Sequence, residues 1–156
     1  MQSRATARLA AVQALYQMET GGTGVDAVVA EFKAHRFGED LVGATFHDAD
    51  EDFFAEVVRG VVRLQAKIDP LVEQRLSNNW TLPRLDATAR AILRAAAYEF
   101  INEPSFPSVA IINEYVEIAK AFFEGEDPRF INAVLDALAR DLRAEEFAGG
   151  RQSRRP

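Results

Sequence analysis

The sequence DFFAEVVRGVVRLQAKI, residues 52–68, indicates the class of fold, because its apolar residues recur every three or four positions. Such spacing keeps one face of a helix apolar over about four turns. The residues on this face are Phe53, Phe54, Val57, Val58, Val61, Leu64 and Ile68. We therefore predict that residues 52–68 form a central packing helix.

The same helical period continues on both sides, without alternating apolar and polar runs flanked by hairpin turns. Asp69 and Pro70 predict a helix end and a new start, because the residue before proline disfavours helix and proline suits a first turn. Asp127 and Pro128 repeat this pattern, and Ser108 is placed to cap another helix. Further helices are expected at 4–18, 25–36, 70–77, 85–102, 108–124 and 128–142. The predicted fold is all-α, with about seven helices as estimated from periodicity.

Length and composition favour one globular domain. The 156 residues can bury a core without disulfides, and the absence of cysteine excludes thiolate nucleophiles and cysteine-ligated metal clusters. Arg4 and Arg8 before the run 9–18 faintly resemble a signal peptide, but this run has a helical period and no A-x-A site follows. No stretch approaches the ~18 apolar residues of a membrane span. A cytoplasmic protein is therefore expected.

The charge is unevenly distributed. Lysine and arginine number 18 against 24 aspartate and glutamate residues, a net charge of −6. The arginines outside the first and last acidic residues, Glu19 and Glu146, are Arg4, Arg8, Arg151, Arg154 and Arg155. An acidic body with basic ends is unlike a general polyanion binder, so any nucleic-acid binding is expected to be local.

The sequence contains no recognisable catalytic motif. Asp48, Asp50 and Asp52 alternate as in a calcium loop, but Phe53 replaces the required glycine and Arg59 the bidentate glutamate. We interpret these acids as a solvated loop before a helix. The two histidines have no metal-ligand spacing, and nucleophile-elbow, Walker and dinucleotide motifs are missing. No catalytic residue, metal site or cofactor is predicted.

A binding function has more support. Arg4 and Arg8 lie one turn apart on what we expect to be an exposed helical face, where both could contact phosphates. Phe130 follows Arg129 in the first turn of a predicted helix, which suits base stacking beside a phosphate contact. Packing of Phe130 into the core is an equally open alternative.

Three blocks of sequence resemble the NusB family of bacterial transcription antitermination factors. They are Ala7-Arg8 with AVQALY at 11–16, Trp80 and Arg84-Leu85 with most of 91–100, and 107–122 with FINAVLD at 130–136. The resemblance spans Arg4 to about Arg143. It implies one domain, 1–148, of two packed helical sub-bundles at about 1–80 and 81–148, followed by a flexible basic tail at 149–156.

The resemblance also implies a function without catalysis. The expected ligands are boxA-type single-stranded RNA and the ribosomal protein NusE, within the RNA polymerase antitermination complex of ribosomal RNA operons. Position by position, the implied RNA-binding residues are Arg4, Arg8, Gln13, Asp127, Arg129, Phe130 and Asn132. The implied partner-binding residues are Ser108, Asn113 and Glu114.

Other functions remain open from the sequence. The chain could be a NusB-like interaction or ribosomal-RNA-processing module without sequence-specific RNA binding, or the NusB-like part of a ribosomal RNA methyltransferase. It could be a helical protein that binds only basic proteins, or a hydrolase with buried paired carboxylates. Glu114 and Glu117 are neighbours on a predicted helix, but we interpret them as a solvated pair. Apolar surface on the first helix could also support a homodimer.

Overall fold

The computed structural model describes residues 3–35, 37, 48–76, 80–123 and 127–147. Within them the regular elements are six α-helices and one short 3-10 helix, with an isolated bridge between Ser3 and Ala49. They are α1 (Arg4–Gly21), α2 (Val25–His35), α3 (Glu51–Glu73), η1 (Leu82–Arg84), α4 (Ala87–Asn102), α5 (Ser108–Phe122) and α6 (Asp127–Leu142). The predicted all-α class is confirmed.

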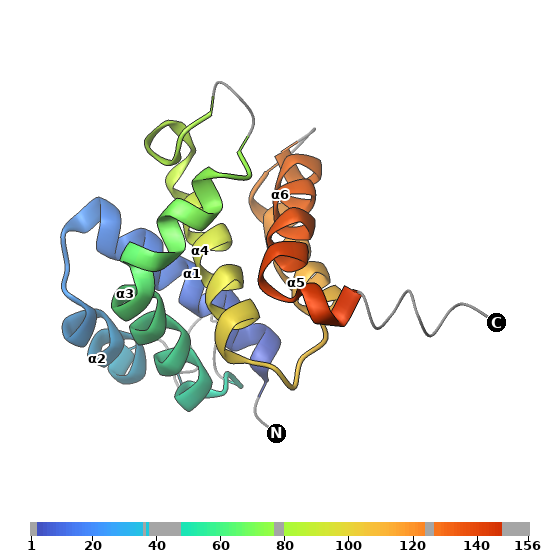
Figure 1. Cartoon of the computed structure of the whole chain (residues 1–156). Coiled ribbons are helices and arrows are strands. Elements are labelled where there is room, and N and C mark those ends of the chain that lie inside the picture. Colours follow the sequence, from blue (N-terminus) through green and yellow to red (C-terminus); the bar gives the residue numbers. More distant parts are fainter. Residues whose placement is uncertain (1–2, 36, 38–47, 77–79, 124–126, 148–156) are drawn as a thin grey trace.

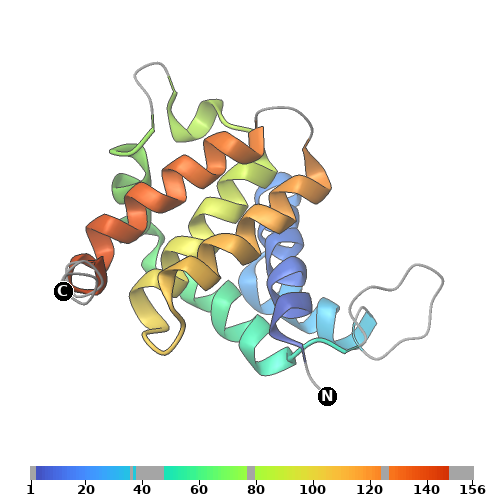
Figure 2. The same ribbon diagram turned by 90° about the vertical axis from the view of Figure 1, so that its right-hand side faces the viewer.

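Helix α4 lies at the centre of the molecule (Figures 1 and 2). It packs against α1 and α3 on one side and against α5 and α6 on the other, while α2 covers α1 and α3. Helix α3 lies on one side of the core. Helix α4 packs both against the pair α1 and α3 and against the pair α5 and α6. The boundary near residue 80 between two sub-bundles stays a prediction.

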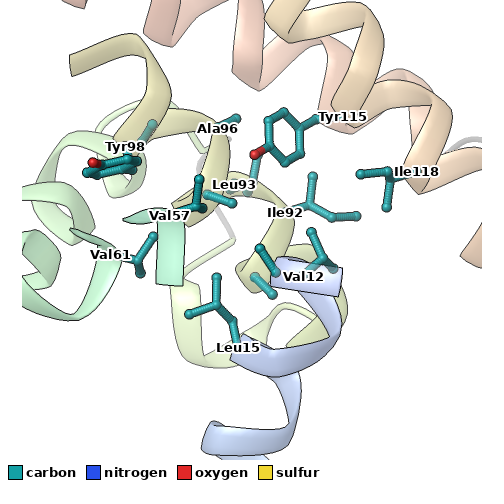
Figure 3. Packing of buried hydrophobic residues seen from close by; sticks show 14 of the residues in the cluster. Val12, Leu15, Val57, Val61, Ile92, Leu93, Ala96, Tyr98, Tyr115 and Ile118 are labelled. Carbon is teal, nitrogen blue, oxygen red and sulfur yellow. The ribbon is translucent and has the colours of Figure 1, made fainter. Parts of the chain in front are cut away.

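Small residues on α4 allow this central position. Ala95, Ala96 and Ala97 are fully buried, so neighbouring helices can approach the α4 backbone closely. Figure 3 shows α1, α3 and α5 contributing larger side chains around Ile92 and Leu93 of α4. A helix apolar on nearly all sides belongs inside a fold rather than on its surface.

The predicted helix break at Asp69 and Pro70 is wrong. Helix α3 continues through Pro70 to Glu73, so no separate helix begins there. Pro70 is exposed near the end of α3, while Ile68 and Val72 on either side of it are buried. Asp69 is not a cap, because its carboxylate accepts bonds from Arg94 Nε and Nη2 at 2.9 and 3.0 Å. These contacts hold the part of α3 around Pro70 against α4.

The predicted cap at Ser108 is also wrong. Pro107 takes the cap position of α5, and Ser108 is the first helical residue. Its backbone N–H and its Oγ donate to the two carboxylate oxygens of Glu146, each at 3.0 Å. A residue distant in sequence therefore caps α5, a contact that local patterns cannot reveal.

The segment after α6 also fastens the end of α4. The Arg143 guanidinium donates to the backbone carbonyls of Phe100 at 2.9 Å, Glu99 at 3.1 Å and Glu103 at 2.6 Å, and to that of Phe106. The carbonyls of Glu99 and Glu103 already accept from the backbone N–H groups of Glu103 and Phe106, so Arg143 is their second donor, and it adds bonds to the carbonyls of Phe100 and Phe106. Arg143 and Glu146 together fix the connection from α4 to α5.

The predicted tail at 149–156 lies outside the described ranges. Among the residues that are described, no helix is long and apolar enough to cross a membrane.

Gly60 in the middle of α3 permits close contact with Tyr98 of α4. A Cβ at this position would overlap the ring of Tyr98, whose hydroxyl donates to Glu56 Oε2 at 2.9 Å. The absence of a side chain, rather than backbone conformation, is what this position requires.

We expect Gly60→Ala to lower the free energy of unfolding by about 1–3 kcal/mol, because the added methyl group must displace the Tyr98 ring. Urea unfolding followed by circular dichroism measures this change. Gly21→Ala is the matched control, since a Cβ there meets Thr23 Oγ1 at an ordinary 3.7 Å. Equal stability of the two variants would contradict the close packing of α3 on α4.

Candidate nucleic-acid interface

Arg8 does not lie on the surface, so the prediction that its helical turn is exposed is wrong. The residue is 5% exposed, and its Nε and Nη2 donate to the two carboxylate oxygens of Glu99 at 2.8 and 2.9 Å. Tyr115 also donates its hydroxyl to Glu99, and Glu114 lies 3.8 Å from Arg8 Nη1. Helix α1 turns this face toward α4 and α5, where the ion pair joins three helices.

The protonation state of this network is fixed by its surroundings. Burial by itself would lower the pKa of Arg8, but the hydrogen bonds and charge of Glu99 raise it. Burial and the charge of Glu99 raise the pKa of Tyr115 well above its usual value. The pKa shifts therefore keep Arg8 as a guanidinium cation and Tyr115 as a neutral phenol that can donate to Glu99. Glu99 is a buried carboxylate with its partners in place, rather than half of an acid pair suited to hydrolysis.

Arg4 is the accessible member of the predicted arginine pair. Its side chain is 46% exposed, and its guanidinium carbon lies 4.9 Å from the ring centre of Phe53 and 4.6 Å from that of Phe106. Asp50 Oδ2 lies 3.8 Å from Arg4 Nε. These contacts orient the guanidinium while leaving part of it open to an anion.

Phe130 is half-buried at the edge of a cleft. It is therefore neither fully exposed for base stacking nor fully packed into the core, the two alternatives that periodicity left open. Its ring centre lies 6.2 Å from that of Trp80, with the ring planes 49° apart. The cleft has a volume of about 300 Å³. Its lining residues are Trp80, Arg84, Leu85, Asp86, Ala89, Phe123, Asp127, Phe130 and Ile131. Arg129 and Asn132, two other predicted RNA-binding residues, are exposed on the same helix.

A second hollow, of about 490 Å³, contains the remaining predicted RNA-binding residue, Gln13. It also includes Tyr16 and Phe122, which are each 43% exposed. Asp86 lines both this hollow and the aromatic cleft, so the two are adjacent. Helices α1, α5 and α6 thereby bring Gln13 and Phe130 to neighbouring hollows, whereas Arg4 lies near the other end of α1 (Figure 2).

Five aromatic and basic residues of these hollows were not predicted as site residues, namely Trp80, Arg84, Phe123, Tyr16 and Phe122. Trp80 and Arg84 are far from Phe130 in sequence, and their proximity depends on how α6 packs on α4. Tyr16 lies on the apolar line of the first helix and therefore resembled a core residue. Phe122 ends the apolar line of α5. For Phe122, the only local indication of a site residue was that an aromatic side chain stands at a helix end.

The predicted partner residues differ in accessibility. Asn113 is exposed and Glu114 is partly exposed, but Ser108 is 1% exposed and bonded to Glu146. Direct contact of Ser108 with a partner is therefore excluded in this conformation. Its side chain instead fixes the first turn of α5.

The carboxylates elsewhere in the described ranges are not arranged as a metal site. Within the described ranges, no group of three or more histidine, aspartate or glutamate side chains is placed to hold an ion. Glu117 pairs with Lys120 at 3.1 Å on the exposed side of α5. Glu103 is unusual, because burial and a hydrogen bond with Glu56 raise its pKa to about 7.

Comparisons with known proteins all match this chain to the NusB family. The sequence profile of the NusB family matches residues 5–140. The chain is 58% identical over 143 residues to the transcription antitermination protein NusB of Caulobacter vibrioides, covering 92% of this chain and 96% of the relative. It is 56% identical over 142 residues to that of Sinorhizobium fredii, covering 91% and 89%.

Solved structures share the fold. NusB of T. maritima superposes with a TM-score of 0.78 at 28% identity, covering 95% of this chain and 99% of that one. A structure described as the antitermination factors NusB and NusE in complex with dsRNA gives a TM-score of 0.74 at 22% identity, covering 88% and 96%. The latter similarity concerns the fold alone.

Replacing Arg8 should test its structural role. We expect Arg8→Met to lower the free energy of unfolding by about 3–5 kcal/mol, because it leaves the Glu99 carboxylate buried without its counterion. Arg8→Met combined with Glu99→Gln should recover much of this loss. Urea unfolding measures both. Arg129→Met, an exposed control, should stay within about 0.5 kcal/mol of the wild type, and an equally mild effect of Arg8→Met would contradict the buried ion pair.

The raised pKa of Glu103 should appear in the pH dependence of stability. The folded state binds this proton up to about pH 7, whereas the unfolded carboxyl releases it near 4.5. The free energy of unfolding of the wild type should therefore fall, relative to Glu103→Gln, as pH rises from 4.5 to about 7. Urea unfolding across this range measures the difference. Parallel curves for the two proteins would contradict the prediction.

Proposed function

Because this chain belongs to the NusB family, we propose that it is a transcription antitermination factor that binds boxA-type single-stranded RNA together with the ribosomal protein NusE. The complex would act with RNA polymerase in ribosomal RNA operons. This role places the protein in the cytoplasm, where RNA is transcribed. It requires binding surfaces and no catalytic step.

The observation that carries the RNA-binding proposal is the pair of adjacent hollows containing Gln13 and Phe130. Half-buried and exposed aromatic rings there offer faces for unstacked bases, as single-stranded RNA requires. Arg129 and Asn132 stand beside the aromatic cleft and can contact phosphate or base edges. Arg4 lies farther along α1 and could contact another phosphate of the same strand.

The acidic body limits RNA to this surface. A net charge of −6 disfavours non-specific contacts elsewhere, and we expect no phosphate contact from Arg8, because it is buried and paired with Glu99. RNA binding by the chain alone should therefore be weak. A basic partner protein would add affinity and would be attracted by the same acidic charge.

The proposed partner surface centres on Asn113 and Glu114 of α5. Glu114 approaches Arg8, so the partner surface adjoins the network that holds α1 against α4 and α5. Ser108 and Glu146 would act indirectly by fixing where α5 begins. Self-association into a homodimer stays a prediction.

Binding to a short boxA-like RNA, with and without NusE and at several salt concentrations, tests the function. We expect weak binding alone, tighter binding with NusE, and a shallow salt dependence because few phosphates are neutralised. Equal affinity for a scrambled RNA in the presence of NusE would favour an interaction or ribosomal-RNA-processing module without sequence-specific RNA binding.

Two substitutions test the location of the RNA. Phe130→Ala should weaken binding by about 1–3 kcal/mol through lost stacking, whereas Arg129→Ala should reduce the magnitude of the log–log salt slope by about 1. Fluorescence anisotropy of labelled RNA measures both. Lys67→Ala on the exposed side of α3 is the matched control and should change neither quantity. Unchanged binding by both site variants would place the RNA elsewhere.

A further inference from the structure

We propose that the cleft between Trp80 and Phe130 is a subsite for a single nucleobase, with Trp80 supplying an aromatic face and nearby carboxylates selecting a base that carries an amino group. This inference rests on the proposed RNA-binding function and extends it to Trp80 and Asp86. Neither residue was a candidate from the sequence.

The shape of the cleft suits a flat ring. Trp80 is 44% exposed, although a side chain as large and apolar as tryptophan is usually mostly buried. Phe130 lies near it and is half-buried. Their ring centres lie 6.2 Å apart and their planes are inclined by 49°, which forms a wedge rather than a closed stack. A base entering this wedge can stack on one ring and meet the other with its edge, the two arrangements that aromatic rings prefer.

Arg84 supports Trp80 in this role. Its guanidinium carbon lies 5.6 Å from the Trp80 ring centre, within the range of a cation–π contact. The contact orients the indole and places positive charge beside the cleft. That charge favours the phosphate of the nucleotide whose base is bound.

Two carboxylates give the cleft a preference among bases. Asp86 and Asp127 both line it, and each offers only hydrogen-bond acceptors when ionised. Asp86 already accepts a bond from the Thr88 backbone N–H at 2.8 Å, which fixes its position as the cap of α4. The exocyclic amino groups of cytosine, adenine and guanine can donate to such acceptors. Uracil has no amino group and should bind less well.

The same carboxylates argue against an apolar protein side chain as the occupant. An inserted leucine or phenylalanine would remove water from Asp86 and Asp127 without replacing the lost hydrogen bonds, which is costly for charged groups. A base satisfies these acceptors and the aromatic faces together. The combination of rings, acceptors and a neighbouring cation therefore fits a nucleobase.

Trp80→Leu is the decisive variant, because it keeps an apolar residue at an exposed position but removes the aromatic face. In the complex with NusE, its affinity for the boxA-like RNA should fall by about 5- to 150-fold, whereas Trp80→Phe should retain most of the affinity. Val62→Ala, at another exposed apolar position, is the control and should bind as the wild type does. Thermal unfolding establishes that each variant is folded.

Two further measurements identify the occupant. Abasic replacements along the RNA should include one position where the loss of affinity and that of Trp80→Leu are not additive, since both remove the same stacking contact. Uracil at that position should bind more weakly than a base with an amino group. Trp80 is the only tryptophan, so fluorine-labelled tryptophan in this chain reports on the cleft alone. Its NMR signal should shift on addition of the RNA to the complex.

The outcomes separate the two proposals. If the wild type binds the RNA but Trp80→Leu binds equally well, or if no abasic position is coupled to Trp80, the nucleobase subsite is overturned and the proposed function stands. A shift of the fluorine signal by NusE without RNA would assign the cleft to the protein partner and would also overturn the subsite. If the wild type with NusE does not bind the RNA, both proposals fall.

Discussion

The buried ion pair between Arg8 and Glu99 fixes how α1, α4 and α5 meet. Two charges removed from water are tolerated only when each finds good partners, and here the guanidinium binds both carboxylate oxygens while Tyr115 donates to one of them. A small displacement of any of the three helices would leave a charge or a hydroxyl unpaired. The network therefore favours one arrangement of these helices more strongly than apolar packing alone, which tolerates small shifts.

The surfaces proposed for RNA and NusE both depend on this arrangement. Helix α1 carries Gln13 and Tyr16 on its open side while its other side is held by Arg8, and α5 presents Asn113 and Glu114 after Ser108 is fixed by Glu146. Helix α6 packs on α4 and so brings Phe130 to Trp80. Residues outside the proposed binding surfaces thus determine where the proposed ligand-binding groups lie.

The structure shows which of the N-terminal arginines leave positive charge on the surface, which the sequence does not. Two arginines near the N-terminus suggested a basic patch, yet one is neutralised inside the molecule and the other is stacked on Phe53 and Phe106 beside Asp50. Local positive charge is therefore sparse, and aromatic surface is the larger part of the proposed RNA site. Such a surface binds RNA through base stacking more than through phosphate neutralisation, and it gains from a basic partner protein.

The sequence by itself determined the all-α class, most helix positions and the family, because apolar periodicity and family motifs are properties of local sequence. It also singled out Phe130. The tertiary structure decided that α3 continues through Pro70, that Glu146 holds Ser108, that Arg8 is buried and that Trp80 joins Phe130. Each of these depends on a residue far away in the chain: Arg94 holds Asp69, Glu99 binds Arg8, and the packing of α6 on α4 closes the cleft. A helical period shows which residues share a face, but only the packed partner determines whether that face meets solvent.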